Sequence, residues 1–472
     1  MKQIVLLLLF GFLVTPCVKA QELSLKKGKI IDAVPVRDSV TEDFAFYLPT
    51  TFDASKSWPL MVVFDMQGRG KQTLRLLKEV ADKKGYIMAS PNQVHDSLSV
   101  AKNILMTSRT LLTTASLFNI DKGRIYTVGF DHGGDFAAVV PSFIRGVEGV
   151  ISIGATIGNP DLLSLKNPFH FIGIVGTSDY NYPDTRATKK LLNRLKFPNQ
   201  IILFDGGHEW PKHTELYRAL EYFDLAAMAR ENVVKDSTLI QTSLSNSLKE
   251  VDRRIAKKEF ILADNLLEQL VDVYRVHLDN EPIKEKRTLL KKDKGFKARK
   301  RAENNVLFKE SLLKEDYNFY LYEDAITYNY NNLGWWNYQM GEIKEFTEST
   351  QLGEKAMGKR LHGYVNNLAE ENIKALQSEK PVDEEAVLFL WMLKTITNPD
   401  DYSYYLKVIS KTAEHQDYGT AIFYVEELLK NGYTNKEELY NLEHTALLRI
   451  TPEFNKVVAK YLKDARYDFI EE

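Results

Sequence analysis

The first half of the chain alternates between two hydrophobic patterns. Short apolar runs rich in β-branched and aromatic residues, typical of buried strands, alternate with segments whose apolar residues recur at helical spacing. The helical segments include Lys71–Lys84, Leu98–Phe118 and Lys212–Arg230. The predicted strands are Thr41–Leu48, Leu60–Phe64, Tyr86–Ala89, Ile125–Gly129, Gly149–Ala155, Phe171–Val175 and Ile201–Phe204. This alternation predicts an α/β fold with a mostly parallel sheet.

The pattern changes near Glu231. Strand signals fade, Gly and Pro become scarce, and heptad-like apolar spacing takes over, as in Phe260, Ala263, Leu267 and Leu270. We therefore predict a separate all-α domain after the sheet domain. The predicted divisions are a signal peptide at 1–20, an α/β domain at 21–230, a linker at 231–250 and a helical domain at 251–472.

The N-terminal segment has the pattern of a secretory signal. Lys2 precedes an apolar run, Ile4–Val14, which is too short to span a bilayer, and Val18–Ala20 is a plausible cleavage site. We expect an exported bacterial protein, periplasmic or secreted, with no membrane span after cleavage. Cys17 is the only cysteine, so the mature chain would form no disulfide. The net charge of −2 gives no indication of nucleic-acid binding.

The segment Arg124–Val140 reads as a strand, a tight turn and a helix. Its turn fits the G-x-S-x-G nucleophile elbow, in which small residues two positions either side of the serine let strand and helix approach closely. Here the motif is Gly129-Phe130-Asp131-His132-Gly133, so Asp131 stands where the serine is expected.

Two further polar residues follow strands later in the chain. Asp179 lies after the apolar run Phe171–Val175, and His208 lies in a Gly-Gly turn after Ile201–Phe204. The order of nucleophile position, acid and histidine is that of α/β-hydrolase triads. Because ligands bind at the carboxyl ends of strands in α/β sheets, these residues predict a hydrolase-type cleft.

These motifs carry a resemblance. Residues 42–230 resemble the α/β-hydrolase family, and within it secreted esterases of the feruloyl-esterase and polyhydroxybutyrate-depolymerase type. The motifs are FDMQGRG (Phe64–Gly70), GFDHGG (Gly129–Gly134), GTSDYNYP (Gly176–Pro183) and GGHEWP (Gly206–Pro211). The resemblance implies that Asp131 holds the nucleophile position, His208 is the general base and Asp179 orients it.

The resemblance also implies an oxyanion hole. Its first donor would be the main-chain N–H of His132, and its second the N–H of Met66 or Gln67 after the strand Leu60–Phe64. No cofactor is implied.

Asp131 argues against ordinary ester hydrolysis, because a carboxylate is expelled from a tetrahedral adduct sooner than an alkoxide. A carboxylate does attack saturated carbon, as in dehalogenases and epoxide hydrolases, whose elbows resemble this one. Those enzymes usually carry a helical cap, for which the stretch Thr156–Phe169 is too short. Tyr180, Tyr182 and Trp210 stand near the expected mouth instead, as binding groups or as packing.

Simpler interpretations remain open. Asp131 could cap the helix that follows it, and Asp179 and His208 could be turn residues. Asp131 and Asp135, four residues apart, could bind a metal, but acidic residues at a helix start more often complement the helix dipole. We therefore expect no metal. Ser178 could replace the missing serine, but it lies on the loop of Asp179.

The second half resembles tetratricopeptide repeats without a clean 34-residue period. Ala256–Tyr274 resembles half a repeat, Asn331–Phe346 resembles its Leu-Gly…Gly-Glu turn at Leu333, Gly334 and Gly341, and Ala421–Val458 resembles a final repeat with its cap. Such a domain binds a protein or peptide or merely supports its neighbour.

We therefore expect a protein of esterase ancestry with weak or no esterase activity. It would act by binding a ligand, such as a small molecule or a carbohydrate ester, or a partner. The alternative is a hydrolase that uses Asp131 as a covalent nucleophile at saturated carbon.

Overall fold

A computed structural model describes residues 26–37, 41–463 and 465–467, so the predicted signal peptide lies outside the described residues. An eight-stranded sheet has the order β1-β2-β4-β3-β5-β6-β7-β8. The strands are β1 (Ile30–Pro35), β2 (Asp43–Tyr47), β3 (Trp58–Phe64), β4 (Ile87–Pro91), β5 (Ile120–Phe130), β6 (Val147–Ile153), β7 (His170–Gly176) and β8 (Asn199–Phe204). Strand β2 pairs antiparallel with β1 and β4, and the remaining pairs are parallel, which confirms the prediction of a mostly parallel sheet.

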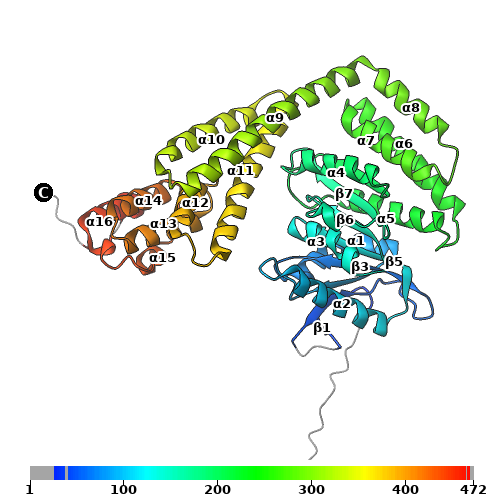
Figure 1. The fold of residues 1–472 in the computed structure, drawn as a ribbon, viewed down its shortest axis with the longest axis horizontal. Helices are drawn as coiled ribbons and strands as arrows, with labels where there is room; N and C mark the ends of the chain where they lie inside the picture. The colour runs from blue at the N-terminus through cyan, green and yellow to red at the C-terminus, as the bar shows by residue number, and fades with distance from the viewer. Residues whose placement is uncertain (1–25, 38–40, 464, 468–472) are drawn as a thin grey trace, which may run out of the picture.

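Helices cover both faces of this sheet (Figure 1). On one face Leu74 and Leu220 join the core, and on the other Phe136 and Leu192 do so. The helices are α1 (Gly70–Lys84) and α5 (His213–Ala229) on the first face, and α2 (Val100–Leu117), α3 (His132–Phe143) and α4 (Tyr182–Arg194) on the second. This layering and strand order are those of the α/β-hydrolase fold. Between β6 and β7 lies only a short 3₁₀ helix, η1 (Pro160–Leu162).

The first core continues past the predicted domain boundary at residue 230. Helix α6 (Ser237–Ala256) occupies most of the predicted linker, and its residues Ile240 and Val251 are buried in the same core as the sheet. The core also includes residues of α7 (Phe260–Tyr274), α8 (Glu281–Lys292) and the start of α9 (Lys294–Ile326). The core of the sheet domain therefore extends through the region predicted as linker and into the region predicted as a separate helical domain.

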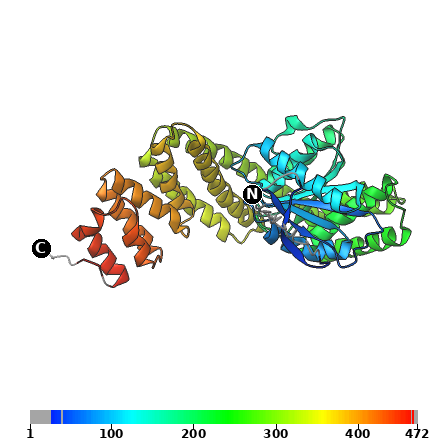
Figure 2. The same cartoon turned by 90° about the horizontal axis from the view of Figure 1, so that it is seen from below.

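Helix α9, 33 residues long, leads from the sheet domain into a second lobe (Figures 1 and 2). This lobe is all helical, as predicted. Its helices are α10 (Leu333–Glu348), α11 (Leu352–Ser378), α12 (Glu384–Thr397), α13 (Tyr402–Glu414), α14 (Tyr418–Lys430), α15 (Lys436–Asn441) and α16 (Pro452–Leu462), with 3₁₀ turns η2 (Tyr330–Asn332) and η3 (Leu448–Ile450). Gly341, which the repeat resemblance places at a turn, lies inside α10 instead.

Two cores hold the second lobe together. One surrounds the fully buried Trp336 between α9 and α12, and the other surrounds Val425 between α12 and α16. Within the described residues, we find no helix that combines the length and apolar character needed to cross a membrane.

Candidate functional site

The turn between β5 and α3 is a strained elbow. Asp131 has φ 53° and ψ −130°, a conformation that side-chain-bearing residues rarely adopt, and its N–H donates to the Ile153 carbonyl at 2.9 Å. A Cβ on Gly129 would lie 2.0 Å from the Gly133 carbonyl oxygen, and one on Gly133 would lie 2.4 Å from that of Phe64. The small residues flanking the turn are therefore required by close strand–helix approach.

The Asp131 side chain points toward His208. It makes no capping hydrogen bond to α3 in the described structure, although Asp131 holds the N-cap position. Its Oδ1 lies 3.4 Å from Nε2 of His208, whose Nδ1 lies 3.1 Å from Oδ2 of Asp179. The structure thus brings the three residues singled out from the sequence together, with the imidazole between two carboxylates.

The electrostatics of this group differ from those of a serine triad. Burial alone would lower the pKa of His208, but hydrogen bonds to Asp131 and Asp179 outweigh it and raise the pKa to about 9. Burial acts to raise the pKa of Asp131, yet the hydrogen bond to His208 and the charge of His132 hold it below its usual range. At neutral pH His208 is therefore an imidazolium, which has no free nitrogen lone pair to accept a proton.

The donors that the resemblance assigns to an oxyanion hole are partly engaged. The main-chain N–H of Gln67 donates to Oδ1 of Asp65 at 2.9 Å. The carbonyl of Met66 accepts the N–H of Asp96 at 3.0 Å, which ties this loop to its neighbour. The N–H of His132 stabilises the Asp131 carboxylate and helps to lower its pKa. The Asp131 carboxylate thus competes for the donor that would stabilise an oxyanion.

Tyr180 forms a fourth member of the group. Its hydroxyl lies 3.3 Å from Nε2 of His208 and 3.5 Å from Oδ1 of Asp131. Burial and the neighbouring Asp131 carboxylate raise the pKa of this phenol, so it stays protonated. The sequence placed Tyr180 near the mouth, and the structure shows a hydrogen-bond donor beside the nucleophile position.

Asp135 lies one helical turn beyond Asp131. Its Oδ1 accepts the Thr156 N–H at 3.1 Å, and burial raises the pKa of its carboxyl to about 6. Over the part of the chain that the structure describes, no group of three or more His, Cys, Asp or Glu side chains is arranged to hold a metal ion.

Helix α11 of the second lobe contacts the site directly. Asn367 Oδ1 accepts a hydrogen bond from the Tyr180 hydroxyl at 3.3 Å, and Glu371 Oε1 lies 3.2 Å from Nε2 of His132. The Glu371 hydrogen bond raises the pKa of His132. The expectation that Thr156–Phe169 leaves no room for a cap agrees with the short η1 found there. Side chains of the kind that a cap supplies come at this site from α11, much later in the chain.

The loop that carries Asp179 is also held from the second lobe. Arg360 Nη1 donates to the Thr177 carbonyl at 2.7 Å, and Lys314 Nζ donates to the Tyr180 carbonyl at 2.8 Å. Arg360 is itself paired with the buried Glu310 at 2.9 and 3.0 Å. No local motif marks these residues, because they act through tertiary contact alone.

A cavity of about 460 Å³ opens beside His208. Its walls come from the loops after β7 and β8 and from α11, and include Ser178, Tyr180, His362 and Gly363. Throughout the described ranges the Ser178 hydroxyl makes no hydrogen bond to His208, so Ser178 does not stand in for the missing serine.

No family model matches the sequence, and no curated protein matches it. Among solved structures the chain is similar to Est1E from Butyrivibrio proteoclasticus (14% identity, 42% of this chain, 100% of that one, TM-score 0.34). It is also similar to S-formylglutathione hydrolase (FrmB) from Staphylococcus aureus (13%, 41% and 95%, 0.33) and to Thermogutta terrifontis esterase 2 (13%, 45% and 98%, 0.35). Such low identities carry no function, which must be argued from the site.

Proposed function

We propose that this protein is an α/β-hydrolase-fold protein of esterase ancestry that is catalytically silent toward esters and acts by binding. The observation that carries the proposal is the imidazolium of His208 held between the carboxylates of Asp131 and Asp179. Ligand and partner binding would use the cavity beside His208 and the helical lobe.

Three features of the site support silence toward esters. The Asp131 carboxylate leaves a tetrahedral adduct more readily than the alkoxide it should displace. His208 is already protonated at neutral pH and cannot act as a general base. The N–H of Gln67 donates to the Asp65 carboxylate, and the N–H of His132 stabilises the Asp131 carboxylate. The first two features remove the nucleophile and the general base that acyl transfer requires, and the third weakens the oxyanion hole.

A short-chain nitrophenyl ester tests this proposal. Wild type and Asp131→Ala should hydrolyse it at the same rate within about twofold, because neither supplies a nucleophile. Asp131→Ser should exceed both, since it restores a hydroxyl and removes one of the two charges that keep His208 protonated. Wild-type turnover that disappears in Asp131→Ala would overturn the proposal.

A second function, displacement at saturated carbon, is favoured by one observation. The protonated Tyr180 hydroxyl beside Asp131 can donate to a leaving oxygen, such as that of an epoxide, while Asp131 attacks the neighbouring carbon. The resulting ester at Asp131 carries no charge, so one of the influences that raise the pKa of His208 disappears. The tyrosinate left at Tyr180 takes the proton of His208 Nε2, 3.3 Å away, so the neutral imidazole can activate the water that cleaves the ester.

Mass spectrometry separates the two functions. The His208→Gln variant lacks the base that would cleave the ester, so a reactive epoxide or alkyl halide should leave a stable adduct on Asp131 if displacement occurs. The binding proposal predicts no adduct on the peptide that contains Asp131. An adduct that forms in His208→Gln but not in the double variant His208→Gln/Asp131→Asn would establish the second function instead.

We also infer that the protein is exported. The support is the pattern of a basic residue, an apolar run and a small-residue cleavage site within residues 1–20. Expression with the native leader in a bacterium should give a periplasmic or secreted chain beginning at Gln21, as measured by intact mass. A full-length chain retained in the cytoplasm would contradict this inference.

A further inference from the structure

A second cavity, of about 500 Å³, lies between the sheet domain and the helical lobe. It is bounded by the turn between α6 and α7, by the starts of α7 and α11, by α9, and by the loop after β7. Ser178, Asp205 and Lys359 line both this cavity and the one beside His208, so the two are neighbours. We call it the basic cavity because six Lys and Arg residues line it.

Unpaired positive charge surrounds the basic cavity. Five cationic side chains line it and make no ion pair with any residue that the structure describes. They are Lys257, Lys258, Arg299, Lys355 and Lys359. The sixth cation, Arg360, is neutralised by the buried Glu310.

The acidic residues of the cavity do not balance this charge. Glu259 lies 3.5 Å from Arg254, outside the set of five. Glu303 is bound to Arg186 at 3.0 Å and to Lys300 at 2.7 Å. Asp205 is then the single acidic residue of this cavity without a cation partner among the described residues. The basic cavity therefore carries a clear excess of positive charge.

Two helix N-termini also open into the basic cavity. Its lining includes Phe260, Ile261 and Leu262 of the first turn of α7, and Leu352 and Gly353 of the first turn of α11. In the described chain neither helix receives a side-chain capping hydrogen bond from its N-cap residue. First-turn N–H groups without partners, together with the positive end of the helix dipole, bind anions.

We propose that the basic cavity binds a small organic molecule bearing phosphate or sulfate groups. Five free cations and two helix N-termini suit an oxyanion with more than one negative charge. The apolar side chains of Ile261, Val306 and Leu352 would contact the organic part. A volume of about 500 Å³ falls within the range of small-molecule sites. The site needs no chemistry at Asp131.

Calorimetric titration of the full chain tests the proposal, with inorganic phosphate, pyrophosphate and sulfate as probes in low-salt buffer. Wild type should bind pyrophosphate more tightly than phosphate, and rising NaCl should weaken both. Lys257→Glu/Lys355→Glu, one change on each side of the basic cavity, should weaken pyrophosphate binding at least about tenfold. Arg299→Gln, a milder change, should weaken it less.

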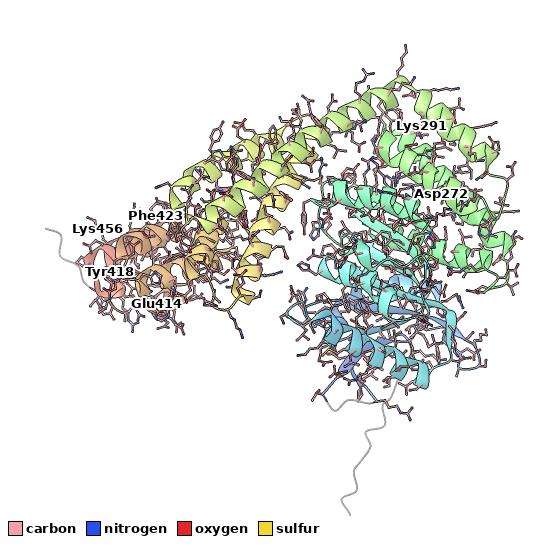
Figure 3. The ribbon with its side chains drawn as sticks, viewed as in Figure 1. Asp272, Lys291, Glu414, Tyr418, Phe423 and Lys456 are labelled. Carbon is pink, nitrogen blue, oxygen red and sulfur yellow. The ribbon has the colours of Figure 1, made fainter. Side chains whose placement is uncertain are left out.

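The matched control is Lys122→Glu/Lys456→Glu. Both lysines are exposed and outside the basic cavity, and Lys456 lies near the far end of the helical lobe (Figure 3). This control should bind as wild type does, and so should Asp131→Ala. No binding of any probe to wild type, equal binding by wild type and the cavity variant, or equal loss in the control would each overturn the proposal. Sugar phosphates and sugar sulfates then distinguish the two ligand chemistries.

Discussion

At the scale of single residues, the aspartate in the elbow changes the charge of the site as well as its nucleophile. A serine would leave His208 with one carboxylate neighbour, whereas Asp131 supplies a second. Burial raises the pKa of Asp135, and the negative charge of Asp131 raises it further. The elbow geometry persists, because it depends on Gly129 and Gly133 rather than on the residue between them.

Asp135 gives a prediction about pH. Its pKa is raised to about 6 in the folded protein, above the value near 4 of an unfolded aspartate, so stability falls as pH rises through this interval. Asp135→Asn removes this titration and keeps an acceptor for the Thr156 N–H. We expect the variant to be more stable than wild type by about 1–3 kcal/mol at pH 7.5, and equal to it below about pH 4.

Urea unfolding at several pH values measures this difference. Asp161→Asn, at an exposed position, is the control and should stay within about 0.5 kcal/mol of wild type throughout. An Asp135→Asn protein that is less stable than wild type at pH 7.5 would contradict the account.

At the scale of elements, α7 covers the free edge of the sheet at β8. Strand β8 is terminal in the sheet, and an unpaired edge invites aggregation. Asn265 accepts the Leu203 N–H at 3.2 Å and donates to the Ile201 carbonyl at 2.8 Å. Gln269 donates to the same carbonyl at 2.9 Å. Helix α7 thus binds the free edge with side-chain amides.

Gln269→Ala tests the importance of this contact. The side chain is 1% exposed and accepts the hydroxyl of the fully buried Tyr222 at 2.9 Å. Removing it leaves that hydroxyl without a partner and creates a cavity, so unfolding free energy should fall by about 2–4 kcal/mol. Gln241→Ala on the exposed face of α6 is the matched control. Equal stability of the two variants would show that α7 is not bound in this way.

The sequence predicted elements better than their assembly. The strands β2 to β8 follow from local periodicity, whereas β1 was not predicted. Asp131, Asp179 and His208 could be located because each follows a strand. Most of helix α6 was predicted as linker, because its many polar residues make its narrow apolar stripe, which includes Ile240 and Val251, hard to recognise. Asn367 could not be found from the sequence, because its place beside Tyr180 depends on how α11 packs.

At the scale of the whole molecule, the two lobes are joined at the site. The ion pair of Arg360 with Glu310 is buried where α9 and α11 meet, and Arg360 also binds the loop of Asp179. Helix α11 lines both the basic cavity and the cavity beside His208, so one helix of the second lobe forms part of both.

A double-mutant cycle measures the strength of this junction. Arg360→Met or Glu310→Gln alone alters a buried pair whose members are 3% and 1% exposed. Arg360→Met, which leaves the Glu310 charge buried, should cost about 3–5 kcal/mol of unfolding free energy. The double variant should cost clearly less than the sum of the single changes. Strictly additive losses would mean that the two residues do not act as a pair.

The protonated imidazolium of His208, held by two carboxylates, underlies the proposed lack of esterase activity. Nuclear magnetic resonance titration of histidine-labelled protein measures this most directly, with His208→Gln to assign the signal. We predict a pKa of about 9 for His208 in wild type and a lower pKa in Asp131→Asn, which lacks one carboxylate. A wild-type pKa near 6.5, the ordinary value of histidine, unchanged in Asp131→Asn, would contradict it.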